Sequence, residues 1–149
     1  MTRMTLGTAL IAGLLLAPMG ANAGERTNDE KAVKAAVEAF KRGGESRDVA
    51  SLGSVLHEDF RVLFTWTHEP GVTRLDKAGY LGLLEAGKIG GTAGTIEFAD
   101  VQVRDEIAIA EATIVRGDAR FESSFTLLRG EQGWTIVQDA VVVEAKESQ

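Results

Sequence analysis

Two polar side chains, those of His68 and Asp139, are the candidates for acid–base chemistry in this sequence. His68 continues the alternation of an apolar segment that includes Phe64 and Trp66. An imidazole beside an aromatic ring at the mouth of a cavity could accept a proton or donate a hydrogen bond to a ligand. Because the Pro70-Gly71 turn follows almost at once, the alternative is a solvent-exposed histidine without a role.

Asp139 interrupts an apolar segment near the end of the chain. By alternation it shares a face with Val137 and Val141 and opposes Trp134 and Ile136. A buried carboxylate without a partner is costly, so Asp139 either faces water, pairs with a base such as arginine, or lines a cavity. In the last case it is the second acid–base candidate.

Four aromatic side chains are candidates for the wall of an apolar binding site: Phe64, Trp66, Tyr80 and Phe125. Tyr80 is the only tyrosine, and its amphipathic ring suits a half-hydrated position at a cavity. Trp66 could stack on a flat ligand. The alternative is ordinary packing, at the rim for Tyr80 and in the core for Trp66.

The composition excludes several kinds of site. The chain has no cysteine, which excludes thiol catalysis and disulfides, and two histidines are too few for a zinc site of several imidazoles. His57, Glu58 and Asp59 resemble a metal cluster, but consecutive residues point in different directions, so we predict no metal and no cofactor. A formal net charge of −6 without a basic cluster argues against nucleic acid as a partner.

Residues 1–23 have the pattern of a signal peptide. Arg3 gives a positive start, Leu6–Ala17 is apolar but short for a membrane span, and Ala21-Asn22-Ala23 is a small-x-small cleavage pattern. The sequence therefore predicts one mature domain over residues 24–149 and a periplasmic or secreted protein that has no membrane contact after cleavage. The alternative is an N-terminal membrane anchor.

Three helices are expected in the first part of this domain. Thr27 and Glu30 predict a capping box at the start of the first helix, and Gly43-Gly44 predicts its end. Asp48 and Asp76 occupy the positions of N-caps for a second and a third helix.

Six segments have the alternation expected of strands. They lie over residues 60–67, 72–74, 95–104, 107–116, 119–129 and 134–144. Short connections between the last four require antiparallel hairpins. A shift of the apolar phase near Ala99-Asp100 predicts a β-bulge that curves the sheet, and the glycine-rich loop over residues 87–94 is expected to be a mobile rim.

This order predicts the α+β class, with three N-terminal helices packed on one face of a strongly curved, mostly antiparallel sheet. A sheet that bends around helices leaves a hollow at its open end, and such hollows are common ligand sites.

Three motifs give the chain a resemblance to a known family. They are Gly43-Gly44 after an amphipathic helix, Leu56-His57-Glu58-Asp59-Phe60 before the first strand, and Gly133-Trp134-Thr135-Ile136-Val137 in the last strand. Over about residues 29–143 the chain resembles the nuclear-transport-factor-2-like (NTF2-like) superfamily, which includes SnoaL-like polyketide cyclases and ketosteroid isomerases. The resemblance implies a cone-shaped, cystatin-like fold, whereas activity depends on the site that each member carries.

The resemblance does not imply ketosteroid isomerase activity. A ketosteroid isomerase needs a carboxylate base on the first strand, where this chain has Phe64, Thr65 and Trp66. It also needs a tyrosine on the first helix, which has none here, and a protonated acid on a later strand, where Ser123 and Ser124 stand.

Three functions remain open from the sequence. The first is an exported domain that binds a small apolar molecule in a pocket at the open end of the cone. The second is a cofactor-independent isomerase, lyase or cyclase that uses His68 and Asp139 as acid and base. The third is a dimeric scaffold without a ligand, because the run Val141-Val142-Val143 predicts burial on both faces of the sheet and a homodimer through its outer face.

Overall fold

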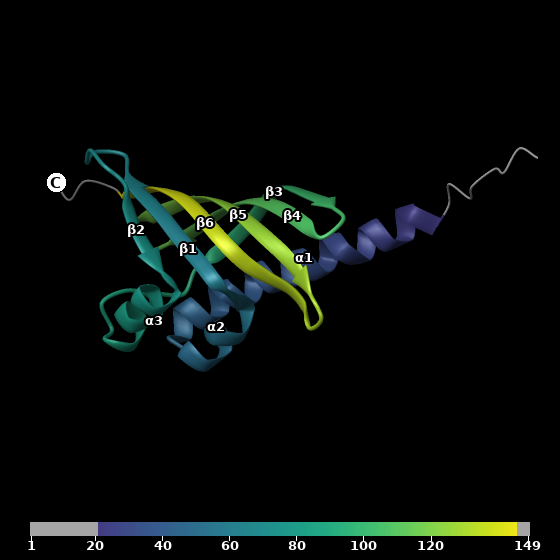
Figure 1. The fold of residues 1–149 in the computed structure, drawn as a ribbon. Helices are drawn as coiled ribbons and strands as arrows, with labels where there is room; N and C mark the ends of the chain where they lie inside the picture. Colours follow the sequence, from purple (N-terminus) through teal and green to yellow (C-terminus); the bar gives the residue numbers. More distant parts are fainter. Residues whose placement is uncertain (1–20, 146–149) are drawn as a thin grey trace, which may run out of the picture.

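A computed structural model describes residues 21–145 of the chain, and it has the predicted order of helices and strands (Figure 1). The elements are α1 (Ala21–Ser46), α2 (Val49–Val55), β1 (Leu56–Trp66), β2 (Thr73–Asp76), α3 (Lys77–Glu85), β3 (Thr95–Arg104), β4 (Ile107–Arg116), β5 (Ala119–Gly130) and β6 (Gly133–Ala145). The α+β class is therefore confirmed.

The predicted signal peptide lies almost wholly outside the described residues. Only its last residues, from Ala21, belong to the described part, where they form the start of α1. None of the described helices is long and apolar enough to cross a membrane.

One six-stranded sheet has the order β2-β1-β6-β5-β4-β3. Only the β1–β6 pair is parallel, because β6 returns along the sheet and inserts beside β1. The predicted short hairpin is confirmed, with Phe64 opposite Thr73. The mostly antiparallel sheet therefore has the first and last strands of the domain side by side, with only β2 beyond them at that edge.

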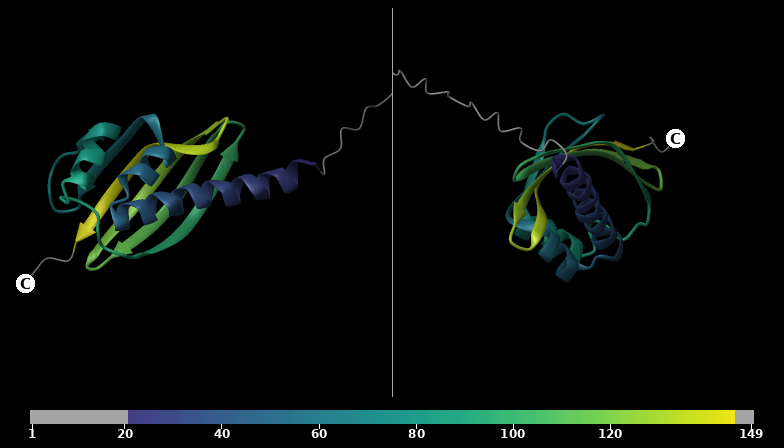
Figure 2. Two further views of the ribbon diagram at one scale, coloured as in Figure 1. Left: turned by 90° about the horizontal axis from the view of Figure 1, so that it is seen from below. Right: turned by 90° about the vertical axis from the view of Figure 1, so that its right-hand side faces the viewer.

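The sheet curves around α1, so that the helix lies inside its concave face (Figure 2). The predicted irregularity in β3 is confirmed, since the pairing shifts between Phe98 and Asp100. A second irregularity was not predicted: Leu127 pairs with Ile136 while Thr126 pairs with Gln138, which leaves Val137 of β6 without a partner on β5. Such bulges bend a sheet and re-aim the side chains that follow.

The bulge at Val137 corrects the predicted facing of Asp139. Because one residue is added to β6, Trp134 and Ile136 before the bulge and Asp139 and Val141 after it are all buried on the concave face. The prediction that Asp139 lies on the other face of the strand from Trp134 and Ile136 is therefore wrong. The prediction that it shares a face with Val141 is confirmed.

The predicted start of α1 is also wrong. The chain is already helical at Ala21, and Thr27 lies inside the helix. Its hydroxyl donates to the carbonyl oxygen of Ala23 at 3.0 Å, one turn back. A threonine inside a helix commonly donates its hydroxyl to the carbonyl oxygen four residues before it, whereas an N-cap threonine would accept from a backbone N–H.

The helix does not end at Gly43-Gly44 but continues to Ser46. Arg47 then takes a positive φ of 53°, and the Asp48 N–H donates to the Gly43 carbonyl at 2.9 Å, which is the bond of a Schellman motif. Gly43 instead allows close packing, since a Cβ there would lie 2.6 Å from Leu52 Cγ of α2. The Asp48 N-cap is confirmed, with its carboxylate accepting from Ser51 N–H.

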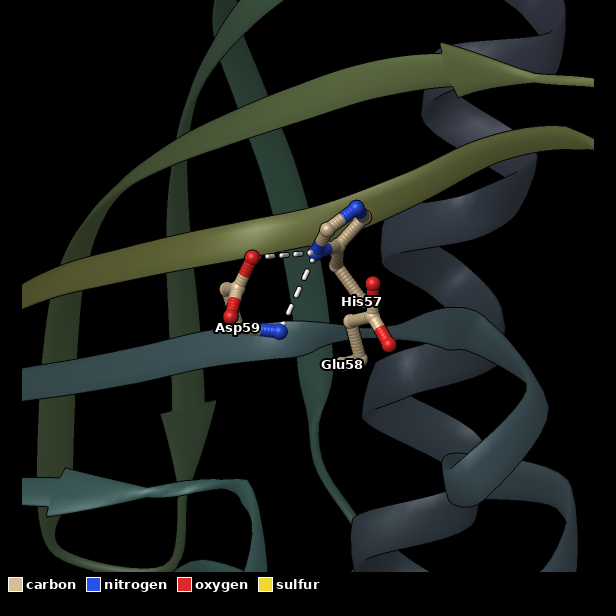
Figure 3. Close-up of side chains that lie close together, drawn as sticks. All are labelled: His57, Glu58 and Asp59. Atoms are coloured by element: carbon tan, nitrogen blue, oxygen red, sulfur yellow. Dashed lines mark hydrogen bonds and ion pairs between the residues drawn. The ribbon is translucent and has the colours of Figure 1, made fainter.

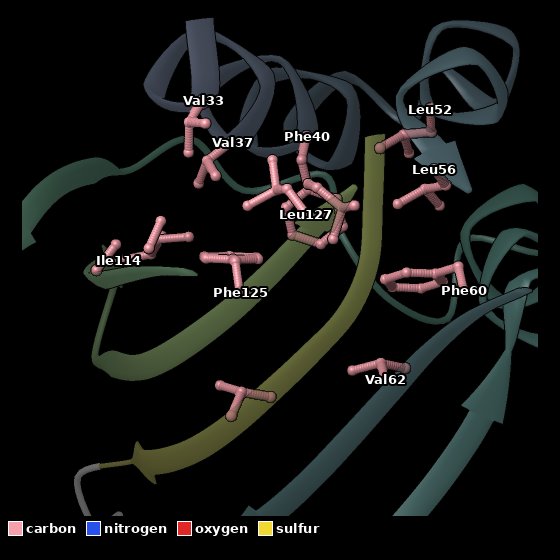
Figure 4. Close-up of a cluster of buried hydrophobic side chains, with 14 of the residues drawn as sticks. Val33, Val37, Phe40, Leu52, Leu56, Phe60, Val62, Ile114, Phe125 and Leu127 are labelled. Carbon is pink, nitrogen blue, oxygen red and sulfur yellow. The ribbon is translucent and has the colours of Figure 1, made fainter. Parts of the chain in front are cut away.

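The core packs between α1 and the concave face of the sheet (Figure 4). Val33, Val37 and Phe40 of α1 point toward the sheet, and the Phe40 ring meets the Phe125 ring edge-on at 5.5 Å between centroids. Fully buried Leu127 lies in the same cluster. Helix and sheet are therefore held together by interlocking apolar side chains.

Arg47 ties the glycine-rich loop to the end of α1. Its guanidinium donates to the carbonyl oxygens of Ile89 and Gly90, each at 3.0 Å, and of Gly87 at 3.3 Å. The Gly91 N–H donates to the carbonyl of Gly44 at 3.0 Å. Four hydrogen bonds thus hold this part of the loop against α1, while the mobility of the rim stays a prediction.

Two glycine substitutions test this arrangement. Gly90 has φ +69°, and a Cβ there would lie 2.4 Å from the Gly44 carbonyl oxygen, so Gly90→Ala should lower the free energy of unfolding by roughly 2 kcal/mol or more. Gly82 lies inside α3 with no neighbour within 4 Å, so Gly82→Ala should raise it by about 1 kcal/mol or less. Urea unfolding measures both free energies. Equal effects of the two substitutions would refute the close contact between the glycine-rich loop and the end of α1.

Candidate functional site

A cavity of about 360 Å³ lies between the sheet and the ends of α1 and α3. This volume is in the range of small-molecule sites. Its lining is mostly apolar, with a few polar groups: Phe40, Val62, Phe64, Trp66, Leu75, Tyr80, Leu83, Lys88, Ile89, Gly90, Ile114, Arg116, Phe121, Ser123, Asp139, Val141 and Val143. Ile89 and Gly90 of the glycine-rich loop belong to this lining. The hydrogen bonds that Arg47 donates to their carbonyl oxygens therefore help to shape the cavity wall.

Three of the four predicted aromatic residues, Phe64, Trp66 and Tyr80, line this cavity. Phe125 does not, which corrects its predicted place in the wall. Its side chain is 0% exposed and packs against Phe40, because it lies one pleat deeper along β5 than the cavity residue Ser123. A ligand role of the other three rings stays a prediction.

Tyr80 is packed on two sides by aromatic rings. It stacks on Phe40 at 5.8 Å between centroids and meets Phe60 edge-on at 5.6 Å. Burial raises the pKa of the Tyr80 hydroxyl above its usual range, and the negative charge of Asp139 acts in the same direction. The hydroxyl is therefore a neutral hydrogen-bonding group at the cavity.

Arg116, which the sequence analysis missed, brings a positive charge into the site. Its guanidinium carbon lies 5.5 Å from the centre of the Phe121 ring, a cation–π distance. A Cβ on Gly44 would lie 3.6 Å from Arg116 Nη2 and 4.0 Å from the Tyr80 hydroxyl oxygen. Both polar groups therefore converge on the backbone of α1 at Gly44, a position where a side chain would crowd them.

Asp139 is 5% exposed, and its neighbour Ser123 is 4% exposed. Burial raises the pKa of Asp139 to about 7, while the Ser123 hydroxyl and the positive charge of Arg116 oppose that rise. Within residues 21–145, two buried side-chain polar atoms have no hydrogen-bond partner, Asp139 Oδ1 and Arg116 Nε. Both belong to residues of this one cavity.

His68 does not lie in this cavity. The strand β1 ends at Trp66, where the Glu69 N–H donates to the Trp66 carbonyl and starts a turn, so the alternation does not extend to His68. The side chain is exposed and borders a separate shallow hollow with Arg120 and Glu144. The structure therefore does not bring the two predicted acid–base residues together, and a catalytic role of His68 stays a prediction without geometric support.

His57, Glu58 and Asp59 lie closer together than predicted (Figure 3). Each can offer a ligand atom, and these atoms all lie within 4.8 Å of one another, in the stretch where β1 pairs irregularly with β6. The Asp59 N–H, however, already donates to His57 Nδ1 at 3.1 Å, and both acidic residues are exposed. That this cluster binds no metal therefore stays a prediction.

A larger hollow of about 720 Å³ lies beside the start of α1 and the β3–β4 turn. Its walls are mostly charged, and two of the residues that line it, Asp29 and Arg129, form an ion pair. The Arg129 guanidinium also lies over the Trp134 ring at 4.8 Å. These contacts fasten α1 to β5, so we regard this hollow as a structural junction and not as a ligand site.

The buried carboxyl of Asp139 predicts an unusual pH dependence of stability. Its pKa is about 7 in the folded protein, against an ordinary value of 3.8, so the folded state binds more protons between these values. This contribution to stability is fully present below about pH 4 and is lost as the pH rises to about 7. The other groups that face Asp139 are Tyr80 of α3, Arg116 of β4 and Ser123 of β5.

Asp139→Asn removes the charge, so it should remove that loss. The free energy of unfolding of the variant minus that of the wild type should rise by up to about 4 kcal/mol between pH 4 and pH 8. Urea unfolding at both pH values measures this difference, in which the titration of all other carboxylates cancels. A difference that does not change with pH would show that Asp139 is hydrated.

Solved structures with this fold come from several bacteria. An NTF2-like protein of unknown function from Silicibacter pomeroyi has a TM-score of 0.68 and 18% identity, over 81% of this chain and 98% of that chain. A second, from Shewanella baltica, has a TM-score of 0.68 and 15% identity, over 78% and 94%. An NTF2-like protein with a cystatin-like fold from Novosphingobium aromaticivorans has a TM-score of 0.63 and 15% identity, over 87% and 89%. These likenesses confirm the predicted cone-shaped fold.

A search of curated proteins found no match. A family model with the description "putative lumazine-binding" matches residues 28–140, which run from within α1 into β6. The chain therefore belongs to this family of NTF2-like proteins.

Proposed function

We propose that this domain binds a small, flat molecule in the cavity between the sheet, α1 and α3. The observation that carries the proposal is the cavity itself, which has a volume of about 360 Å³. Aromatic and aliphatic side chains form most of its wall, together with Arg116, Ser123 and Asp139. Apolar walls with a few convergent polar groups are typical of ligand sites. The family description adds a ligand class, because lumazine is a flat bicyclic heterocycle, and it makes lumazine the first probe.

An enzymatic function is the second candidate, and one observation favours it. A carboxyl group with a pKa of about 7 is suited to proton transfer near neutral pH, and Asp139 lines the cavity. Binding without catalysis is favoured over it because the other predicted acid–base residue, His68, lies outside the cavity. A reaction would have to use Arg116, Ser123 or Tyr80 beside Asp139.

The binding proposal is tested with two neighbouring substitutions on β6. Val141 lines the cavity, whereas Val142 points to the outer face and is 40% exposed. Lumazine binding, measured by isothermal titration calorimetry, should be saturable in the wild type, at least roughly tenfold weaker in Val141→Phe, and within about twofold of wild type in Val142→Phe. Thermal unfolding establishes that both variants are folded.

Native mass spectrometry of the freshly purified protein extends this test to ligands other than lumazine. A co-purified small molecule that Val141→Phe excludes and Val142→Phe retains supports the proposal. Absence of any bound molecule, together with no lumazine binding by the wild type, would refute it.

We also propose export, on the pattern of residues 1–23. Cleavage before Gly24 is compatible with the fold, because the start of α1 is exposed and its first buried apolar residue is Val33. Cell fractionation and N-terminal sequencing should find a protein outside the cytoplasm that begins at Gly24. A protein that retains Met1 in the cytoplasm would contradict export.

A homodimer through the outer face of the sheet is a further proposal. On that face Ile109 of β4 is 42% exposed and Val142 of β6 is 40% exposed. Ile109→Lys should convert a dimer into a monomer in sedimentation equilibrium, whereas Val72→Lys, at a 55% exposed position before β2, should not. A wild type that is monomeric at all concentrations would rule out this interface.

A further inference from the structure

Arg116 is a cation of the cavity that has no carboxylate partner among the described residues. The ion pairs formed within residues 21–145 at 4.0 Å or less do not include it, and its Nε is buried without a hydrogen-bond partner. The charge of Arg116 also acts on Glu45 of α1, but that carboxylate is already paired with Lys41 at 2.6 Å. An unpaired charge in an apolar cavity is costly, so a negatively charged ligand group would be stabilised here.

Asp139 does not supply the missing negative charge. It is 5% exposed, it belongs to no ion pair of the described residues, and its Oδ1 has no hydrogen-bond partner. A carboxylate held in this way loses its hydration with little compensation, so the protonated acid is favoured. Burial raises the pKa of Asp139 to about 7, in agreement with that argument. As the neutral acid, Asp139 can donate a hydrogen bond.

The polar groups of the cavity are then hydrogen-bond donors that surround a positive charge. The hydroxyls of Ser123 and Tyr80 can donate, and so can the neutral acid of Asp139. Lys88, at an exposed position of the glycine-rich loop, adds a second positive charge to the lining. The planar guanidinium of Arg116 matches a carboxylate, whereas a doubly charged phosphate would be poorly balanced by one half-buried cation and a mostly apolar wall.

We propose, resting on the proposed binding function, that the ligand is a flat aromatic monocarboxylate whose carboxylate pairs with the Arg116 guanidinium. The neutral acid of Asp139 and the Ser123 hydroxyl donate to the same carboxylate, and the ring system lies among Phe64 and Val141 of the apolar wall. The family description names lumazine, which has no carboxylate, so this group is a requirement beyond that description. Because the unpaired atoms are buried, binding requires side-chain rotations, which are common at binding sites.

The proposal couples ligand binding to a proton. The negative charge of a bound carboxylate stabilises the neutral form of Asp139, so the complex holds a proton that the free protein loses above about pH 7. Affinity is therefore fully present below that pH and falls as the pH rises through it. The other groups that face Asp139 keep their charge state in this range. Burial holds the pKa of Tyr80 of α3 above its usual range, and Arg116 of β4 stays protonated. Ser123 of β5 and Val62 of β1 carry no charge.

The matched probes are 1-naphthoate and 1-naphthamide, which share a ring system and differ in charge. Calorimetry at pH 6 and pH 8, in buffers of different ionisation enthalpy, measures their affinities for wild type and counts the protons taken up. Naphthoate should bind roughly tenfold or more tightly than naphthamide at pH 6. Its binding should take up close to one proton at pH 8 and almost none at pH 6, and its affinity should be roughly tenfold weaker at pH 8.

Three variants assign these effects to residues. Arg116→Met removes the cation and should abolish the preference for naphthoate, and a preference that persists would overturn the inference. Arg120→Met removes the same charge outside the cavity, where Arg120 pairs with Glu122 at 3.0 Å, and should leave the preference within about twofold of wild type. Asp139→Asn keeps a donor and cannot ionise, so it should bind naphthoate equally at pH 6 and pH 8 without proton uptake. Thermal unfolding shows which variants are folded.

Four further results would overturn the carboxylate while the binding function stands. In wild type they are equal affinity for naphthoate and naphthamide, naphthoate binding at pH 8 without proton uptake, and binding of lumazine but not of naphthoate. The fourth is a co-purified ligand that has no carboxylate. These measurements decide the inference even if a variant does not fold. If neither naphthoate nor lumazine binds and no small molecule co-purifies, the proposed function fails, and this inference fails with it.

Discussion

One extra residue in the last strand determines the chemistry of the concave face. Without the bulge at Val137, strand alternation would not let the aromatic anchor Trp134 and the carboxyl Asp139 share a face. The bulge permits both, so that the first half of β6 packs in the core and the second half brings a carboxylate into an apolar hollow. The raised pKa of Asp139 and the unpaired Oδ1 both follow from this local change of register.

The second determinant of the cavity is the position along α1 at which bulky apolar side chains end. Val33, Val37 and Phe40 occupy the concave face as far as Phe125, and beyond that point the helix has Gly43 and Gly44 in place of bulky side chains. The missing side chains leave room for α2 on one side and for Arg116 and Tyr80 on the other. At this end of the sheet the cavity is therefore closed mainly by α3 and by the glycine-rich loop that Arg47 holds, and less by α1.

Much of this fold could be predicted from the sequence, because its determinants are local. Alternation located the strands, and the caps Asp48 and Asp76 gave the starts of α2 and α3. The errors arose where a distant contact decides. The bulge at Val137 depends on pairing with β5. The turn that ends α1 depends on Arg47, whose guanidinium donates to the distant carbonyl oxygens of Ile89 and Gly90. Asp139 stood out as a polar residue in an apolar strand, whereas Arg116 gave no signal, since arginine at the end of a strand is usually exposed.

The proposed binding site depends most on Asp139 being a buried carboxyl group of the cavity. Carbon-13 NMR of the aspartate side chains, with the Asp139 resonance assigned from its absence in Asp139→Asn, follows the ionisation of this group directly. A titration midpoint near 7 is expected in the free protein. A midpoint near the ordinary value of 3.8 would place the carboxylate in water and would contradict the site described for this cavity.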